Sequence, residues 1–85
     1  MGKEFKKVSK RLAEKICKKF FGFNVDVFLD PFTSCYFGRS GLIRIDISSH
    51  YGKETDNDYP VFLLQVGNCY LCEFEFVRGN IKKMS

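Results

Sequence analysis

The chain has 85 residues, enough for one small domain built around a single hydrophobic core. Ten Phe and four Tyr residues supply bulky side chains for that core, so we expect it to fold without a metal or cofactor. No apolar run approaches the roughly 18 residues of a membrane span, and the basic first residues lack the apolar segment of a signal peptide, so we expect neither a membrane protein nor a conventionally secreted one. The formal net charge of +4 is uneven, because eight of the 14 Lys and Arg residues lie in positions 3–19 against two acidic residues there.

Residues 3–21 are predicted to form an amphipathic helix, because apolar residues recur every three to four positions. Gly22 follows at the place where a glycine commonly ends a helix. Cys17 falls on the polar flank and is expected to be an exposed thiol. The opposite side gathers the cations that we predict to contact a partner, namely Lys3, Lys7, Lys10, Arg11 and Lys18. A concentrated cationic surface of this kind favours docking on an anionic partner.

After Gly22 the apolar residues alternate with polar ones, which indicates β-strands. We predict strands at about 24–30, 34–37, 42–48, 61–66 and 69–77, a polar loop at 49–60 and a short basic tail after residue 80. Links this short favour antiparallel neighbours. The predicted fold is therefore α+β: an N-terminal amphipathic helix packed on an antiparallel, strongly bent sheet of about five strands, in a single domain of residues 1–85.

Cys69-x-x-Cys72 is the only pattern with metal-ligand spacing. Residues three apart in a strand point to opposite faces, so we interpret the pair as structural thiols. Four cysteines without a secretion signal predict reduced thiols in the cytoplasm, whereas export by another route would allow two disulfides. The alternative is a small zinc or thiol protein that uses Cys69, Cys72, Cys35 and His50.

No motif predicts an enzyme. His50, the single histidine, lies in the polar loop beside two serines, but the chain has no G-x-S-x-G segment to present a nucleophile, so we expect a solvated histidine. Glu54, Asp56 and Asp58 alternate in the same loop without the glycine and final glutamate of a calcium-binding loop. We expect an acidic surface there.

The segment Phe76-Val77-Arg78-Gly79-Asn80-Ile81 resembles the second motif of the Sm-like RNA-binding proteins, a hydrophobic residue followed by Arg-Gly between the last two strands. One helix followed by five strands in about eighty residues is similar to that family as well. The resemblance implies an oligomeric ring in which Arg78 and Asn80 contact RNA bases. The family's first motif is not matched, because no Asn follows Asp46 within the predicted strand 42–48.

The leading hypothesis is a small non-enzymatic binding protein of the adaptor or inhibitor type, similar to those of phages and mobile elements. It would dock on an acidic protein surface or a nucleic acid through the basic helix. The alternative is direct nucleic-acid binding through an Sm-like surface with Arg78 and Asn80, and with Arg39 at the tip of a glycine-rich turn reaching a phosphate. The sequence is also compatible with an oligomeric protein.

Overall fold

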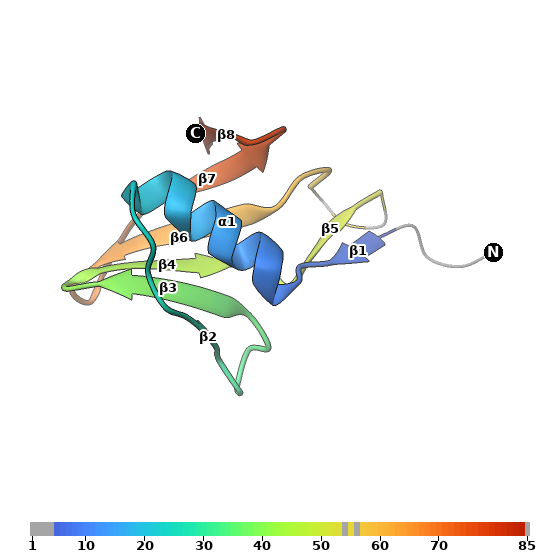
Figure 1. The fold of residues 1–85 in the computed structure, drawn as a ribbon. Coiled ribbons are helices and arrows are strands. Elements are labelled where there is room, and N and C mark those ends of the chain that lie inside the picture. Colours follow the sequence, from blue (N-terminus) through green and yellow to red (C-terminus); the bar gives the residue numbers. More distant parts are fainter. Residues whose placement is uncertain (1–4, 54, 56, 85) are drawn as a thin grey trace.

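The computed structural model describes residues 5–53, 55 and 57–84. In these residues the chain forms one α-helix and eight β-strands (Figure 1). In chain order they are β1 (Phe5–Lys7), α1 (Lys10–Phe21), β2 (Val27–Leu29), β3 (Tyr36–Ser40), β4 (Ile43–Ile47), β5 (His50–Gly52), β6 (Val61–Val66), β7 (Cys69–Val77) and β8 (Asn80–Met84).

Six of the strands form one antiparallel sheet in the order β2-β3-β4-β6-β7-β8, and α1 packs on one of its faces (Figure 1). Strands that are neighbours along the chain are neighbours in the sheet, except where β5 leaves the sheet between β4 and β6. β5 pairs instead with β1 in a separate two-stranded ribbon. The predicted α+β class with a mostly antiparallel sheet is confirmed.

The predicted number of about five strands was wrong, and so was the start of the helix. Residues 5–7 form β1, with Phe5 paired to Gly52 and Lys7 paired to His50. Val8 continues this pairing, since its N–H donates to the carbonyl of Ser49 at 2.8 Å. The segment predicted to be the first turns of a helix is therefore extended, and part of the predicted loop 49–60 is its partner strand. At the other end of the chain, the predicted basic tail forms β8.

Both ends of α1 are capped by the residues that flank the helix in the chain. The Ser9 hydroxyl accepts a hydrogen bond from the N–H of Leu12 at 3.1 Å, which caps the helix start. Gly22 adopts a left-handed conformation with φ 84°, and its N–H donates to the Lys18 carbonyl at 2.9 Å. The predicted glycine stop is confirmed. A residue with a Cβ would be strained at this φ.

The core lies between α1 and the sheet. Phe20 from the helix places its ring 5.7 Å from that of Phe62 on β6 and 5.8 Å from that of Phe74 on β7, and the two strand rings stack at 5.3 Å. The buried residues of this core are Val8, Ala13, Ile16, Cys17, Val27, Ile45, Ile47, Phe62 and Phe76. These residues come from α1 and from five strands or linkers, so the helix holds the sheet together from one side.

Cys17 is part of this core, and its predicted exposure was wrong. The side chain packs against Gly38 of β3, where an added Cβ would overlap its sulfur atom. The missing side chain at Gly38 lets the helix approach the sheet closely, which brings the polar flank of α1 into the core at this point. Burial raises the pKa of Cys17 to about 11, and the nearby Glu14 carboxylate adds to this effect.

A bulge interrupts the alternation in β7. Leu64 of β6 pairs with Cys72, but the next residue, Gln65, pairs with Tyr70, so one residue of β7 has no partner. As a result Cys69 and Cys72, which pair with Val66 and Leu64, lie on the same face of the sheet. The premise that residues three apart must point to opposite faces was wrong for this strand.

Candidate functional site

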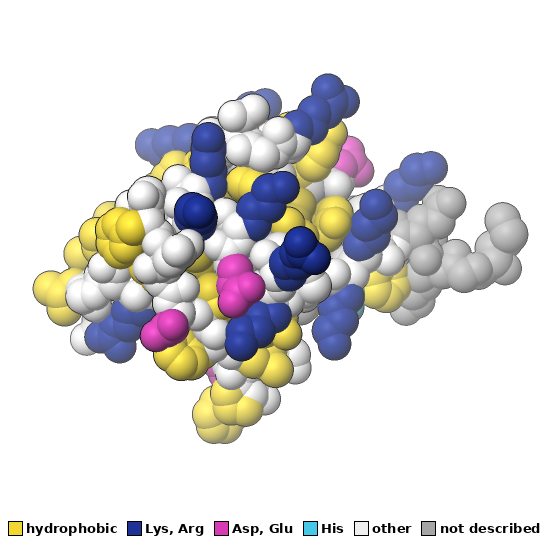
Figure 2. Space-filling model, viewed as in Figure 1, with side chains coloured by type: hydrophobic (Ala, Val, Ile, Leu, Met, Phe, Trp, Pro, Cys, Tyr) yellow, Lys and Arg dark blue, Asp and Glu magenta, His cyan; other side chains and the backbone are white. Residues whose placement is uncertain are grey.

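The outer side of α1 and the adjoining β1 carry exposed cations, which we call the basic face. It consists of Lys6, Lys7, Lys10, Arg11, Lys15, Lys18 and Lys19. None of these side chains forms an ion pair with another residue of 5–53, 55 and 57–84. Lys3, which was predicted to belong to the same surface, lies outside the described residues. Figure 2 shows the Lys and Arg side chains gathered over the helix with few acidic groups between them.

The helical repeat arranges these cations in two rows. Arg11, Lys15 and Lys19 follow each other at four-residue spacing, so each lies about 6 Å further along the axis than the one before. The neighbouring row contains Lys10 and Lys18 with Glu14 between them. The first row is therefore purely cationic, and Glu14 is the single acidic residue of α1.

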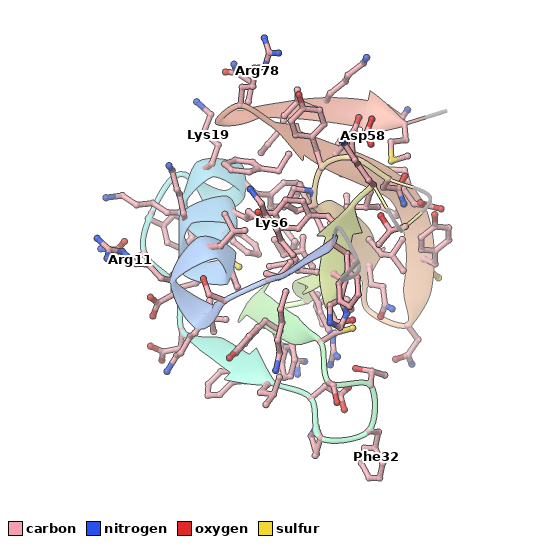
Figure 3. The ribbon with its side chains drawn as sticks, turned by 90° about the vertical axis from the view of Figure 1, so that its right-hand side faces the viewer. Lys6, Arg11, Lys19, Phe32, Asp58 and Arg78 are labelled. Carbon is pink, nitrogen blue, oxygen red and sulfur yellow. The ribbon has the colours of Figure 1, made fainter. Side chains whose placement is uncertain are left out.

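The C-terminal end of α1 and the turn between β7 and β8 enclose a hollow of about 380 Å³, which we call the helix-end groove. Its lining residues are Lys15, Lys18, Lys19, Gly22, Phe76 and Gly79. Arg78 precedes Gly79 in the turn, is exposed, and adopts a left-handed conformation with φ 52°. Figure 3 shows Lys19 and Arg78 pointing into solvent at the same end of the molecule. The structure therefore places Arg78, which belongs to the segment that resembles the Sm-like motif, at the same end of the molecule as the end of α1.

The net charge around this groove is positive in spite of the negative partial charge at the helix terminus. The C-terminal end of a helix carries roughly −0.5 of an elementary charge. Lys18 and Lys19 in the last turn, Lys15 one turn earlier and Arg78 each bring a full positive charge to the same region. No acidic residue is among the described residues that line the groove.

The structure separates Arg39 from Arg78. Gly38 faces α1, so Arg39 as the next residue of β3 points to the opposite face of the sheet. Its Nε donates to the carbonyl of Gly41 at 3.0 Å, which holds the side chain against its own turn. Asn80 is exposed at the start of β8 and close in sequence to the groove. The predicted set of Arg39, Arg78 and Asn80 does not form one surface.

A second hollow, of about 630 Å³, lies on the face of the sheet that α1 leaves uncovered. Its floor contains Arg44, which makes a two-pronged contact with Asp46 (Nη2 to Oδ1, 2.7 Å) and lies 4.0 Å from the centre of the Phe37 ring. Hydrogen bonding to Asp46 raises the pKa of Arg44. Asp30 adds a longer ion pair at 3.7 Å and so ties the β2–β3 loop to the sheet. Sequence analysis missed this cluster, although Arg44 and Asp46 alternate on the polar side of β4.

The four residues of the zinc alternative do not form a cluster. Cys35 lines the hollow on the uncovered face, whereas Cys69 and Cys72 lie on the face toward α1. His50 lies in β5, where its ring meets the edge of Phe5 at 4.9 Å and its Nδ1 is 2.9 Å from the Ser49 hydroxyl. The described part of the chain contains no group of three or more His, Cys, Asp or Glu side chains that could hold a metal ion.

A scan against protein-family models, a search of curated proteins and a search of solved structures found no match to this chain. Within the described residues, no helix has the length and apolar character needed to cross a membrane.

Proposed function

We propose that the protein is a small non-enzymatic binding protein whose basic face docks on an anionic macromolecule. The observation that carries the proposal is the state of the cations on α1: they are exposed, lie on one side of the helix, and have no ion-pair partner in the described chain. The apolar side of α1 is occupied by the core, so the exposed cationic side is the part of the helix that remains for a partner.

The energetics favour a partner with many negative charges. A single exposed ion pair contributes at most about 1 kcal/mol, so an isolated lysine gives little affinity. A row of cations acts together on a polyanion, and displacement of its bound counterions makes the affinity depend steeply on salt. We further propose an adaptor or inhibitor role in the cytoplasm, similar to that of small proteins from phages and mobile elements, because the chain combines small size, unpaired thiols and segregated charge.

Charge reversal on the basic face tests this proposal. We expect the protein to be retained on heparin and on immobilised poly-glutamate, and to elute as salt rises. A triple variant with Lys7→Glu, Arg11→Glu and Lys18→Glu should elute at clearly lower salt, because it loses the contacts of the basic face.

The matched control carries Arg39→Glu, Lys82→Glu and Lys83→Glu, which change the net charge by the same amount from exposed positions outside the basic face. Its elution should stay close to that of the unmodified protein. Equal losses in the two variants would show that only net charge matters and would overturn the assignment of the basic face. Failure of the unmodified protein to bind either polyanion would overturn the function itself.

A further inference from the structure

We propose that the helix-end groove binds single-stranded nucleic acid, with a backbone phosphate held by the surrounding cations and an adjacent base stacked on Phe23. This inference rests on the proposed function and names its partner. Three observations support it: the charge of the groove, its shape, and the exposed aromatic ring that follows its lining residue Gly22 in the chain.

The charge of the groove suits a phosphate. Lys15, Lys18 and Lys19 line it, and Arg78 precedes the lining residue Gly79, so four cations lie in or next to the groove. An arginine offers a planar set of N–H donors that matches phosphate oxygens, and lysines add compact positive charges around it. The half charge of the helix terminus is too small to reverse this balance.

The shape of the groove favours a thin strand over a protein surface. Its volume of about 380 Å³ is of the size that compact ligand groups fill. Two of its lining residues are glycines, Gly22 and Gly79, and apart from their chain neighbours no atom of the described chain lies within 4 Å of the position that a Cβ would take at either one. Both have φ 84°, so the turns that form the walls also require glycine. A phosphate and its sugar can reach the backbone of these walls, whereas the carboxylates of a broad acidic protein surface need no hollow.

Phe23, the residue after the groove-lining Gly22, supplies the proposed stacking platform. It follows Gly22 directly, and 53% of its surface is exposed. Its ring lies 6.1 Å from that of Phe21, which packs against the core and against Phe20. The platform is therefore supported from below and open above. Aromatic rings next to a cationic groove are the means by which proteins bind unpaired bases without reading their sequence.

The experiment measures fluorescence anisotropy with labelled oligo-uridine and oligo-deoxythymidine of about 12 nucleotides, a length within the site sizes of such proteins. A duplex of the same length is the third probe. We expect the single strands to bind more tightly than the duplex, and either RNA or DNA as the tighter strand supports the inference. Phe23→Ala should weaken single-strand binding by roughly 5- to 100-fold, and Arg78→Gln should weaken it and flatten its salt dependence.

Two variants serve as matched controls. Phe28 on β2 is also 53% exposed, so Phe28→Ala removes an equally accessible ring from another part of the molecule. Arg39→Gln removes an exposed strand arginine from the opposite face. Both should leave single-strand binding within twofold of the unmodified protein.

The inference is overturned if Phe23→Ala and Arg78→Gln bind the single strands as tightly as the unmodified protein, or if the duplex binds best. Retention on poly-glutamate separates this failure from failure of the function. A protein that binds poly-glutamate through the basic face but no single strand would refute the nucleic-acid inference and leave the proposed docking function intact, with an acidic protein as the partner.

Discussion

Cys17 and Gly38 define the closest approach between the helix and the sheet. The Cys17 side chain is fully buried, and the position where Gly38 would carry a Cβ is already occupied by its sulfur. A thiol in this place is a small apolar group, and ionising it would put a charge into the core. Its ionisation therefore affects the stability of the whole fold, although its side chain points into the core and away from the basic face.

We expect the fold to lose stability in alkaline solution because of Cys17. Its pKa is raised from 9.0 to about 11 in the folded chain, so the unfolded chain releases the proton first as pH rises. The contribution is fully present below pH 9 and is lost between about pH 9 and 11, by roughly 2 to 3 kcal/mol in total. Urea denaturation at a series of pH values measures this loss.

Cys17→Ala is the control for this measurement, because lysines and tyrosines also titrate in the alkaline range. The alanine variant should be less stable at neutral pH, since it leaves a small cavity, but its stability should fall less steeply above pH 9. Parallel pH profiles for the two proteins would contradict the assignment of the effect to Cys17.

The first turn of α1 is electrostatically unfavourable for a helix. Ser9 caps it, but no acidic residue follows, and Lys10 and Arg11 lie where the helix dipole favours negative charge. Arg11 also faces Lys15 at four-residue spacing, which adds repulsion. The helix is therefore less stable than one with acidic residues in its first turn. This is consistent with cations that are kept for binding.

Arg11→Glu should therefore stabilise the fold by about 0.5 to 1 kcal/mol while weakening retention on polyanions. The favourable dipole interaction and a new Glu-to-Lys pair with Lys15 outweigh the repulsion from Glu14, which lies three residues further along the helix. Lys18→Glu makes the same charge change at the other end of the helix and should destabilise the fold, because it opposes the dipole and repels Glu14. Thermal unfolding of the two variants distinguishes these signs, and shifts in the same direction would contradict the argument.

The sequence predicted well those elements whose pattern of apolar residues reflects burial of one face against the core. The apolar stripe of Leu12, Ile16 and Phe20 does face the sheet, and β6 and β7 have the predicted bounds. β1 was missed because Phe5 and Val8 continue the helical spacing of the apolar residues, although Ser9 at the helix start was a signal against it. β5 and the bulge in β7 depend on pairing with distant residues, and local pattern does not contain that information.

The candidate site was predictable in part for the same reason. The cations of α1 follow from helical periodicity alone. The position of Arg78 beside Lys19 follows from the way β7 and β8 turn back toward the helix, and no local pattern predicts it. Cys17 was misplaced because its burial depends on Gly38, twenty-one positions further along the chain.

The two sides of the six-stranded sheet differ in how their charged side chains are paired. α1 covers one face and adds the basic face to the outside. The other face carries Arg44 in ion pairs with Asp46 and Asp30, with Phe37 beneath the guanidinium, although Arg39 on that face has no ion pair with another described residue. The greater number of unpaired cations on the basic face gives the molecule an electrostatic direction, which steers a polyanion toward α1.

Unmatched positive charge also lowers stability through repulsion, so we expect salt to stabilise the fold. Raising the ionic strength from about 0.01 M to about 0.1 M shortens the screening length from about 30 Å to about 10 Å. Among the described residues, Glu14 is the one acidic group of α1 against the cations of the basic face, so screening removes more repulsion than attraction. We expect the free energy of unfolding in urea to rise by about 0.5 kcal/mol over this range.

General effects of salt on apolar burial act in the same direction, so the test needs a variant that keeps the core and loses the repulsion. Arg11→Gln, Lys15→Gln and Lys19→Gln together remove the purely cationic row from exposed positions. This variant should be at least as stable as the unmodified protein at low salt and should gain less from added salt. An equal gain in the two proteins would mean that the cationic row is not repulsive, and a loss of stability with salt would mean that attraction dominates the surface.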